Sequence, residues 1–297
     1  MESEEVKTGI DIRESGVNIL TSESSNMLYE QFDREEGLYE YVDIENSEEL
    51  DKFDMFSNFF KTVWILGLGG IGGHVAEMVS SLQSVENLVL FDDDIVETSN
   101  LNRTIYTYHH INSPKVLAAS EIVSGRNIGT NVSPIVSRFD ENFCNEIIST
   151  DPYNLTNHDY LDILVVDCRD DFYNDYHLFD KLEKLRYRLK FTIVRAAYDG
   201  MSITLDVNPK ENFVWTKTAS GYENAPSHSI PSRLAALLIL TYSALFFNSD
   251  INGNKRRFRG PYTFNLFDLF NFIHTGVKKK NADMEKNKKE DKNEKTA

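Results

Sequence analysis

The sequence has few cysteines and no long apolar run. Only Cys144 and Cys168 occur among its 297 residues, which excludes a disulfide-rich scaffold and favours a reducing compartment. No uncharged apolar run reaches about 18 residues, the length that a membrane-spanning helix requires. The most apolar stretch, residues 234–247, is interrupted by Thr241 and Ser243. We interpret it as a core helix.

Basic residues are also scarce, and their distribution is uneven. The chain has 31 Lys and Arg against 47 Asp and Glu, a formal net charge of −16. Residues 1–60 hold 17 acidic and 4 basic side chains, so the acidity belongs mainly to the N-terminal part. No concentrated basic face precedes the lysine-rich end, which disfavours a nucleic-acid partner. The opening residues, MESEE, lack the basic start and apolar core of a secretory signal, so we expect a cytoplasmic protein with no membrane partner.

A glycine-rich turn lies between a predicted strand and a predicted helix. Residues 63–66 form an apolar run typical of a buried strand, and Gly67, Gly69 and Gly72 follow with G-x-G-x-x-G spacing. Glycine permits a tight turn and lets the backbone approach a phosphate without a Cβ in between. The first N–H groups of the following helix favour negative charge. The turn, with Gly70 included, therefore predicts a nucleotide site.

Acidic and basic side chains follow the next predicted strand, residues 87–91. Asp92 comes about 20 residues after the last glycine, where an acid can bind ribose hydroxyls. The residues after it add further polar groups to the predicted site: Asp94, Asn100, Asn102, Arg103 and Lys115. Arg and Lys neutralise a triphosphate, which carries more charge than the pyrophosphate of NAD.

A carboxylate also follows a third predicted strand, residues 161–166. Asp170 lies just beyond that strand, and Mg²⁺ in proteins commonly takes one or two carboxylates together with phosphate oxygens. Because open parallel sheets bind ligands at the carboxyl ends of their strands, these groups together fit ATP with magnesium better than NAD.

The combined motifs resemble those of the ThiF/MoeB/HesA-like, ubiquitin-activating E1-like adenylyltransferases. The resemblance covers about residues 60–275 and rests on GLGGIG at the turn, DDD followed by SNLNR, Lys115, and DCRD after the third strand. It implies a Rossmann-like α/β fold, with a doubly wound mixed sheet and helices on both faces. We divide the chain into an acidic extension (1–55), an adenylation domain (56–275) and a charged disordered tail (276–297).

The resemblance implies a role for several residues. Asp92 would hold the ATP ribose, Arg103 and Lys115 would contact the phosphates, and Asp170 would bind magnesium. Arg34 of one subunit of a homodimer would reach the ATP of the other. The implied reaction is attack of a carboxylate on the ATP α-phosphate, with release of pyrophosphate, and the implied partner is a small ubiquitin-like or sulfur-carrier protein or peptide. Catalysis would come from positioning and electrostatic stabilisation.

The sequence also departs from the family pattern. Thr104 replaces a frequent glutamine, and Arg169 and Asp171 occupy variable places in the third-strand motif. Two cysteines cannot form the four-cysteine zinc site of many relatives, so no zinc is expected. No cysteine follows Cys168, and Cys144 lies in an acidic context that raises a thiol pKa. We therefore expect the reaction to end at the adenylate or to pass it to another molecule.

Other interpretations stay open. A small molecule or an RNA-linked carboxylate could be the acceptor. The changes at Thr104, Arg169 and Asp171 are also compatible with a non-catalytic binding subunit. A nicotinamide-dependent dehydrogenase would use Asp92 but would leave Arg103, Lys115 and Asp170 without a purpose. Within 217–231, we interpret Tyr222, His228 and Ser229 as candidates for a substrate channel, although an exposed loop histidine is the simpler interpretation of His228.

Periodicity predicts the remaining elements. Helical spacing is present over 73–82, and Ser113 with Pro114 signals a helix start ahead of 115–123. Residues 132–136 and 191–194 are further predicted strands. Residues 202–207 and 212–216, joined by a turn at Asn208 and Pro209, predict an antiparallel hairpin and hence a mixed sheet.

Overall fold

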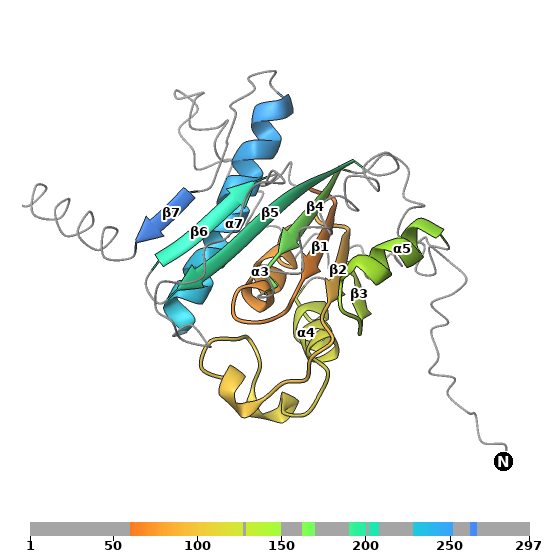
Figure 1. Cartoon of the computed structure of the whole chain (residues 1–297), viewed down its shortest axis with the longest axis vertical. Coiled ribbons are helices and arrows are strands. Elements are labelled where there is room, and N and C mark those ends of the chain that lie inside the picture. Colours follow the sequence, from red (N-terminus) through yellow and green to blue (C-terminus); the bar gives the residue numbers. More distant parts are fainter. Residues whose placement is uncertain are drawn as a thin grey trace, which may run out of the picture.

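One mixed sheet of seven strands runs through the part of the chain that the computed structural model describes (Figure 1). Those residues are 60–126, 129–149, 162–169, 190–199, 202–207, 228–251 and 262–265. The strands are β1 (Thr62–Leu66), β2 (Asn87–Phe91), β3 (Asn131–Ile135), β4 (Asp162–Asp167), β5 (Lys190–Asp199), β6 (Ser202–Val207) and β7 (Tyr262–Asn265). Their order in the sheet is β3-β2-β1-β4-β5-β6-β7. The first five are parallel, and β6 and β7 are antiparallel to their neighbours.

Helices cover both faces of this sheet. Buried side chains of α3 (Gly72–Val79), α4 (Lys115–Ser124) and α7 (Ser229–Ile251) belong to one core cluster. Buried side chains of α5 (Glu141–Ser149) belong to a second cluster with Trp64 and Leu66. The expected α/β doubly wound mixed sheet is confirmed.

The two clusters follow from the alternation of side chains along the central strands. In β1 every residue is buried; Val63 and Ile65 face the first cluster, and Trp64 and Leu66 face the second. A strand buried on both faces needs a continuous apolar run, which is why residues 63–66 predict it from sequence. The second cluster is rich in aromatic rings: Phe91 packs edge-to-face on Phe139, with 5.0 Å between ring centroids.

The antiparallel pairing differs from the expected one. The partners of β6 are β5 and β7, not the segment 212–216, which itself lies outside the described residues. The antiparallel pair of β5 and β6 instead runs to Asp199 opposite Ser202. Sequence patterning detected β6 correctly but assigned its partner to the next alternating segment along the chain.

The predicted helices form close to their expected bounds. The helix expected over 73–82 is α3, followed by turns, and the apolar stretch 234–247 lies within α7. Pro114 is the residue just before α4, as its helix-start signal predicts. Among the described helices, none combines the length and apolarity needed to cross a membrane.

The topology brings three strand ends together. β1 lies between β2 and β4 in the sheet, although β4 follows it by almost 100 residues in sequence. The strand order reverses at this point, and in open α/β sheets ligands bind in the crevice outside the carboxyl ends of the strands there. The segments after β1, β2 and β4 therefore form the first place to search for a site.

Candidate nucleotide-binding site

The glycine turn after β1 is shaped by close backbone approaches. Gly67 has φ +86°, a value that side-chain-bearing residues rarely adopt, and its N–H donates to the Phe91 carbonyl at 2.8 Å. A Cβ on Gly72 would lie 1.9 Å from the Gly67 carbonyl oxygen, whereas a Cβ on Gly69 would meet nothing within 4 Å. The turn is therefore packed at Gly72 and open at Gly69.

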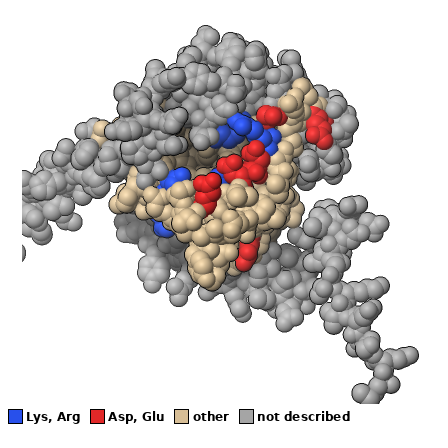
Figure 2. Space-filling view, turned by 60° about the horizontal axis from the view of Figure 1, so that its bottom comes forward, with Lys and Arg blue, Asp and Glu red and all other residues tan. Residues whose placement is uncertain are grey.

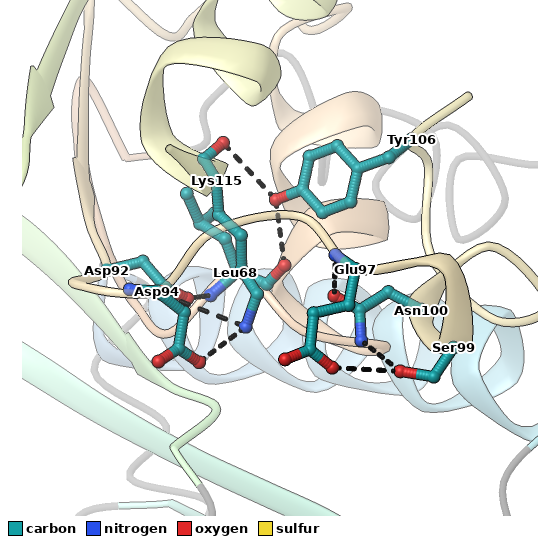
Figure 3. A network of polar contacts seen from close by, with 8 residues as sticks. All are labelled: Leu68, Asp92, Asp94, Glu97, Ser99, Asn100, Tyr106 and Lys115. Atoms are coloured by element: carbon teal, nitrogen blue, oxygen red, sulfur yellow. Dashed lines mark hydrogen bonds and ion pairs between the residues drawn. The ribbon is translucent and has the colours of Figure 1, made fainter. Parts of the chain in front are cut away.

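Asp92 fastens this turn from the end of β2 (Figure 3). Its Oδ2 accepts the Leu68 N–H at 2.6 Å, and its Oδ1 accepts the Asp94 N–H at 2.8 Å. Burial raises the pKa of Asp92, and the positive charge of Lys115 and the two N–H bonds oppose that rise. Both oxygens already serve the protein backbone, so the residue has a structural role that spacing alone did not indicate.

Lys115, the first residue of α4, lies beside Asp92 and Asp94. Its Nζ is 2.6 Å from Asp94 Oδ2 and 3.9 Å from Asp92 Oδ1. The Lys115 side chain is 11% exposed and that of Asp94 is 67% exposed. A buried ammonium of this kind needs carboxylate partners, and the site supplies them.

Tyr106 ties the glycine turn to the start of α4 (Figure 3). Its hydroxyl donates to the Leu68 carbonyl at 2.9 Å and lies 3.3 Å from the Lys115 carbonyl. Burial raises the pKa of this hydroxyl, so it stays protonated and acts as a donor. The residue was not predicted from sequence, because a tyrosine in a loop gives no periodic signal.

The segment 97–104 holds itself in place through Asn100. The Asn100 Oδ1 accepts the Glu97 N–H at 3.1 Å, and the Asn100 carbonyl accepts the Arg103 N–H and the Thr104 hydroxyl at 3.2 and 2.9 Å. Asn100 is buried, so its part in the site is to shape the segment. Thr104, which departs from the family pattern, closes the same turn.

Arg103 lies against the glycine turn at Gly70. Its Cδ would be 3.6 Å from a Cβ on Gly70. The same Gly70 position is approached by the hydroxyls of Ser232 and Tyr198, each at 2.9 Å. The Arg103 guanidinium donates through Nη1 to the Ser99 carbonyl at 2.6 Å and to Asn102 Oδ1 at 3.1 Å.

His74 of α3 contacts the backbone of Arg103, and the sequence did not predict this role. The ring is fully buried, and its Nε2 lies 3.0 Å from the Arg103 carbonyl oxygen. Its Nδ1 lies 3.5 Å from Glu77 Oε2, and Glu77 is paired with Arg126. No sequence signal links His74 to a carbonyl 29 residues away.

Buried charges gather at the end of β4. Asp167 accepts two hydrogen bonds from the Arg169 guanidinium, at 2.8 and 3.0 Å, and lies 3.6 Å from Arg195 Nε. Burial alone would raise the pKa of Asp167, but Arg169 and Arg195 outweigh it and hold the pKa below its ordinary value. Arg169 Nη1 also donates to the Phe139 carbonyl at 2.5 Å. The Arg169 guanidinium is thus occupied by protein acceptors.

The structure brings most of the predicted site residues to one place. Two groups of polar residues contact the turn formed by Gly67, Gly69, Gly70 and Gly72. Asp92, Asp94 and Lys115 are joined to it through Leu68, and Asn100, Asn102 and Arg103 are joined to it at Gly70 through Arg103. Figure 2 shows acidic and basic side chains gathered next to one another on one face of the described part. Asp170 and Arg34 lie outside the described residues.

The two cysteines and His228 have ordinary structural surroundings. Cys144 is fully buried in the second core cluster, and Cys168 packs against the first. Burial raises the pKa of the Cys168 thiol well above its ordinary value, and Asp167 adds to the rise, so this thiol is a poor nucleophile. His228 is exposed, and its Nδ1 accepts the Ile230 N–H at the start of α7. Tyr222 lies outside the described residues.

The fold is of the doubly wound α/β class, and its polar residues gather where such folds bind ligands. Residues 56–219, more than half of the chain, match the ThiF family. The chain belongs to the ThiF family, and the resemblance inferred from its motifs is confirmed.

Two curated relatives share part of this region. The chain is 30% identical over 119 residues to the SAMP-activating enzyme E1 of Haloferax volcanii, covering 40% of each protein. It is 28% identical over 170 residues to Ubiquitin-like modifier-activating enzyme 5 of Caenorhabditis briggsae, covering 57% of this chain and 33% of that protein. The matched regions thus span between a third and two fifths of the length of these relatives.

Solved structures share the fold at low sequence identity. The tRNA N6-threonylcarbamoyladenosine dehydratase TcdA of E. coli superposes with a TM-score of 0.54 and 13% identity, over 80% of this chain and all of that chain. The E. coli MccB structure with ATP gives a TM-score of 0.51 and 17% identity, over 82% of this chain and 77% of that chain. These likenesses establish the fold alone.

Proposed function

We propose that this protein is an adenylyltransferase, which uses ATP to activate a carboxylate. One observation carries the proposal: Lys115 lies beside Asp92, which holds the glycine turn through Leu68, and Arg103 lies against the same turn at Gly70. A nucleotide lying along the open space at Gly69 would meet both cations. Cations placed around a triphosphate stabilise the charge that shifts when pyrophosphate leaves.

The geometry suggests how the nucleotide would lie. Because both Asp92 oxygens accept backbone N–H groups, we assign the ribose contact to the exposed carboxylate of Asp94, with Asp92 shaping the turn that receives it. An ammonium carries three N–H donors. Lys115 can therefore keep Asp94 and still donate to a phosphate oxygen. Arg103 has guanidinium N–H groups beyond the Nη1 contacts, and these would face the phosphates.

We assign magnesium to Asp170, which follows the described segment 162–169, as the family resemblance implies. The described carboxylates of Asp92, Asp93 and Asp94 have oxygen atoms within 4.8 Å of one another, and oxygen donors suit a hard cation. Asp92 and Asp94 are already engaged by N–H groups and by Lys115, so we keep Asp170 as the metal ligand. Bound Mg²⁺ would neutralise phosphate charge; the protein residues bind and orient the nucleotide.

We propose a small protein or peptide with a C-terminal carboxylate as the acceptor. The names of the relatives refer to activation of SAMP and of a ubiquitin-like modifier, and MccB has been solved together with MccA. Carboxylate attack on the α-phosphate would give an acyl-adenylate and pyrophosphate. Since Cys144 is buried and the pKa of the Cys168 thiol is raised, the reaction would end at the adenylate or the adenylate would pass to a nucleophile on another molecule. By the family resemblance, the active form would be a homodimer in which Arg34 reaches the partner's nucleotide.

The alternative is a ThiF-family subunit that binds but does not catalyse. The departures at Thr104, Arg169 and Asp171 motivated it. The contacts of two of these residues favour the enzyme. Thr104 completes the turn that carries Arg103, and Arg169 is occupied by Asp167 and Phe139, so it does not compete for a metal or a phosphate.

Isotope exchange between pyrophosphate and ATP tests the proposal. We expect exchange that requires Mg²⁺ and a carrier protein or peptide ending in glycine. The variant Arg103→Gln should lower the exchange rate about 100-fold, the usual effect of losing one donor to a developing charge. The matched control is Lys61→Gln, which should exchange at the wild-type rate. Lys61 is an exposed cation just before β1, at the amino end of that strand and so away from the glycine turn.

Binding measurements separate the alternatives. Binding of ATP·Mg without exchange, across a panel of glycine-ending carriers, would favour the non-catalytic subunit. Binding of NAD(H) in preference to ATP would overturn the proposal in favour of a dehydrogenase.

A further inference from the structure

We propose that His74 is a positioning residue for Arg103: its hydrogen bond to the Arg103 carbonyl holds that residue against the glycine turn, where the guanidinium meets the nucleotide phosphates. The inference rests on the proposed function, because it assigns Arg103 to the phosphates. His74 lies outside the predicted motifs, and the proposal explains why a polar side chain is buried in α3.

The contact is specific in both direction and place. A carbonyl oxygen only accepts, so His74 can bind it only by donating from Nε2, at 3.0 Å. Glu77 Oε2 is also an acceptor, but it lies farther from the ring, 3.5 Å from Nδ1. A neutral ring carries one proton, and we assign it to Nε2, the nitrogen with the shorter contact. Burial lowers the pKa of His74, which the contacts with Glu77 and the Arg103 carbonyl partly oppose. The donor role at Nε2 does not depend on a charge.

The carbonyl that His74 binds belongs to Arg103, the residue assigned to the nucleotide phosphates. Arg103 sits at the end of the turn built on Asn100, and its guanidinium donates to Ser99 and Asn102 of the same segment. Those partners belong to the same segment and would move with it. His74 is the contact from another element, and it connects the segment to α3, whose first residue, Gly72, closes the glycine turn.

The histidine is itself anchored. Glu77, one turn further along α3, lies beside Nδ1 and pairs with Arg126, which follows the end of α4. A fully buried ring with neighbours at both nitrogen atoms has little freedom to rotate. Arg103 is thus fixed relative to the helix that follows the phosphate-binding turn.

Two substitutions distinguish this role from simple core filling. Leucine at position 74 fills a similar volume but cannot donate, whereas the amide nitrogen of glutamine can replace Nε2 as the donor. The variants are His74→Leu and His74→Gln. The matched control is Thr130→Val, which removes another buried bond from a side chain to a carbonyl, that of Val85 at 2.8 Å. Thr130 directly precedes β3, at the amino end of the strands, whereas the glycine turn follows the carboxyl end of β1.

Equilibrium binding of ATP·Mg and of adenosine is measured for each variant, together with the melting temperature. We expect His74→Leu to weaken ATP about tenfold, the equivalent of one hydrogen bond to a charged or well-ordered group, and to leave adenosine within about twofold. His74→Gln should bind both ligands within about threefold of the wild type. Thr130→Val should melt at a lower temperature yet keep the wild-type ratio of the two affinities.

The comparison with adenosine separates positioning from folding. The inference is wrong if His74→Leu loses affinity for ATP and adenosine to the same extent. It is also wrong if His74→Gln loses as much ATP affinity as His74→Leu. The same holds if His74→Leu binds ATP as well as the wild type. A wild-type protein that binds no ATP at all would instead overturn the proposed function.

Discussion

Gly69 and Gly72 lie three residues apart in one turn, yet an added methyl group would meet very different surroundings. A Cβ on Gly72 would overlap the Gly67 carbonyl at 1.9 Å, while a Cβ on Gly69 would point into open space. Neither glycine has the positive φ found at Gly67, so alanine is conformationally allowed at position 69. The difference separates glycines that fold the turn from one that leaves room above it.

We therefore predict that Gly69→Ala keeps the melting temperature but loses nucleotide affinity. The methyl group would occupy the space through which a phosphate approaches the backbone, and we expect ATP binding to weaken at least about tenfold. Gly72→Ala should instead lower the melting temperature by several degrees, because backbone must move. Calorimetry and thermal unfolding measure both effects. Normal ATP affinity in Gly69→Ala would place the phosphates elsewhere.

At the scale of single residues, spacing selected residues that lie together in the structure but did not reveal all their contacts. The glycines, Arg103 and Lys115 were recognisable because their pattern is local in sequence. Spacing also selected Asp92 as the ribose ligand, but it cannot reveal that both its oxygens accept backbone N–H groups. His74 was missed since its partner is distant in sequence.

Among the elements, β4, β5 and β6 carry a row of buried charges. Asp167 pairs with Arg195 across the parallel ladder, and Arg195 pairs with Asp206 across the antiparallel one. All three residues are at most 4% exposed. The row cannot be recognised in the sequence, because its three members lie in three different strands.

Asp206 makes stability depend on pH. Burial raises its pKa from 3.8 to about 6. Between these values the folded state binds more protons than the unfolded state, so the contribution of Asp206 to stability falls as pH rises through this window. The variant Asp206→Asn has no buried carboxylate to ionise and so avoids this loss of stability. The melting temperature of the variant minus that of the wild type should increase by a few degrees from pH 5 to pH 7.5. A constant difference across that range would mean that Arg195 fully compensates the carboxylate.

Strand patterns were easier to predict than strand partners. The central strands are continuous apolar runs, and a run bounded by glycine or acid is visible locally. Pairing depends on the path of the whole chain. The segment 212–216 alternates as a strand should and follows β6 directly, yet the sheet uses β5 and β7 instead.

The whole molecule has a core that extends past the region matched to the family. That match ends at residue 219, but α7 contributes five of the buried residues in the first cluster, Ala235, Ala236, Ile239, Leu240 and Ala244. Four of these are completely buried. Helix α7 contacts α3, β5 and β6, so it completes the layer that supports the glycine turn.

We predict that a fragment of residues 56–219 will not unfold cooperatively, whereas residues 56–275 will. Without α7, the apolar face of β5 and β6 would be exposed to water, and each Å² of apolar surface exposed would cost about 25 cal/mol of folding free energy. Urea unfolding followed by circular dichroism tests the two fragments in parallel. A cooperative transition in the shorter fragment would show that α7 is dispensable and would contradict the domain bounds of 56–275.

Fold class was the most predictable property at this scale, because glycine turn, apolar strands and intervening helices all indicate the same architecture.

The three fastenings of the glycine turn have a consequence for ligand recognition. Gly67 is tied to Phe91, and Leu68 is tied to Asp92 through its N–H and to Tyr106 through its carbonyl. The turn is therefore preorganised before a ligand binds. An incoming anion would lose its hydration water, but the backbone would lose little conformational entropy, so discrimination between ligands would depend on the side chains of Lys115 and Arg103.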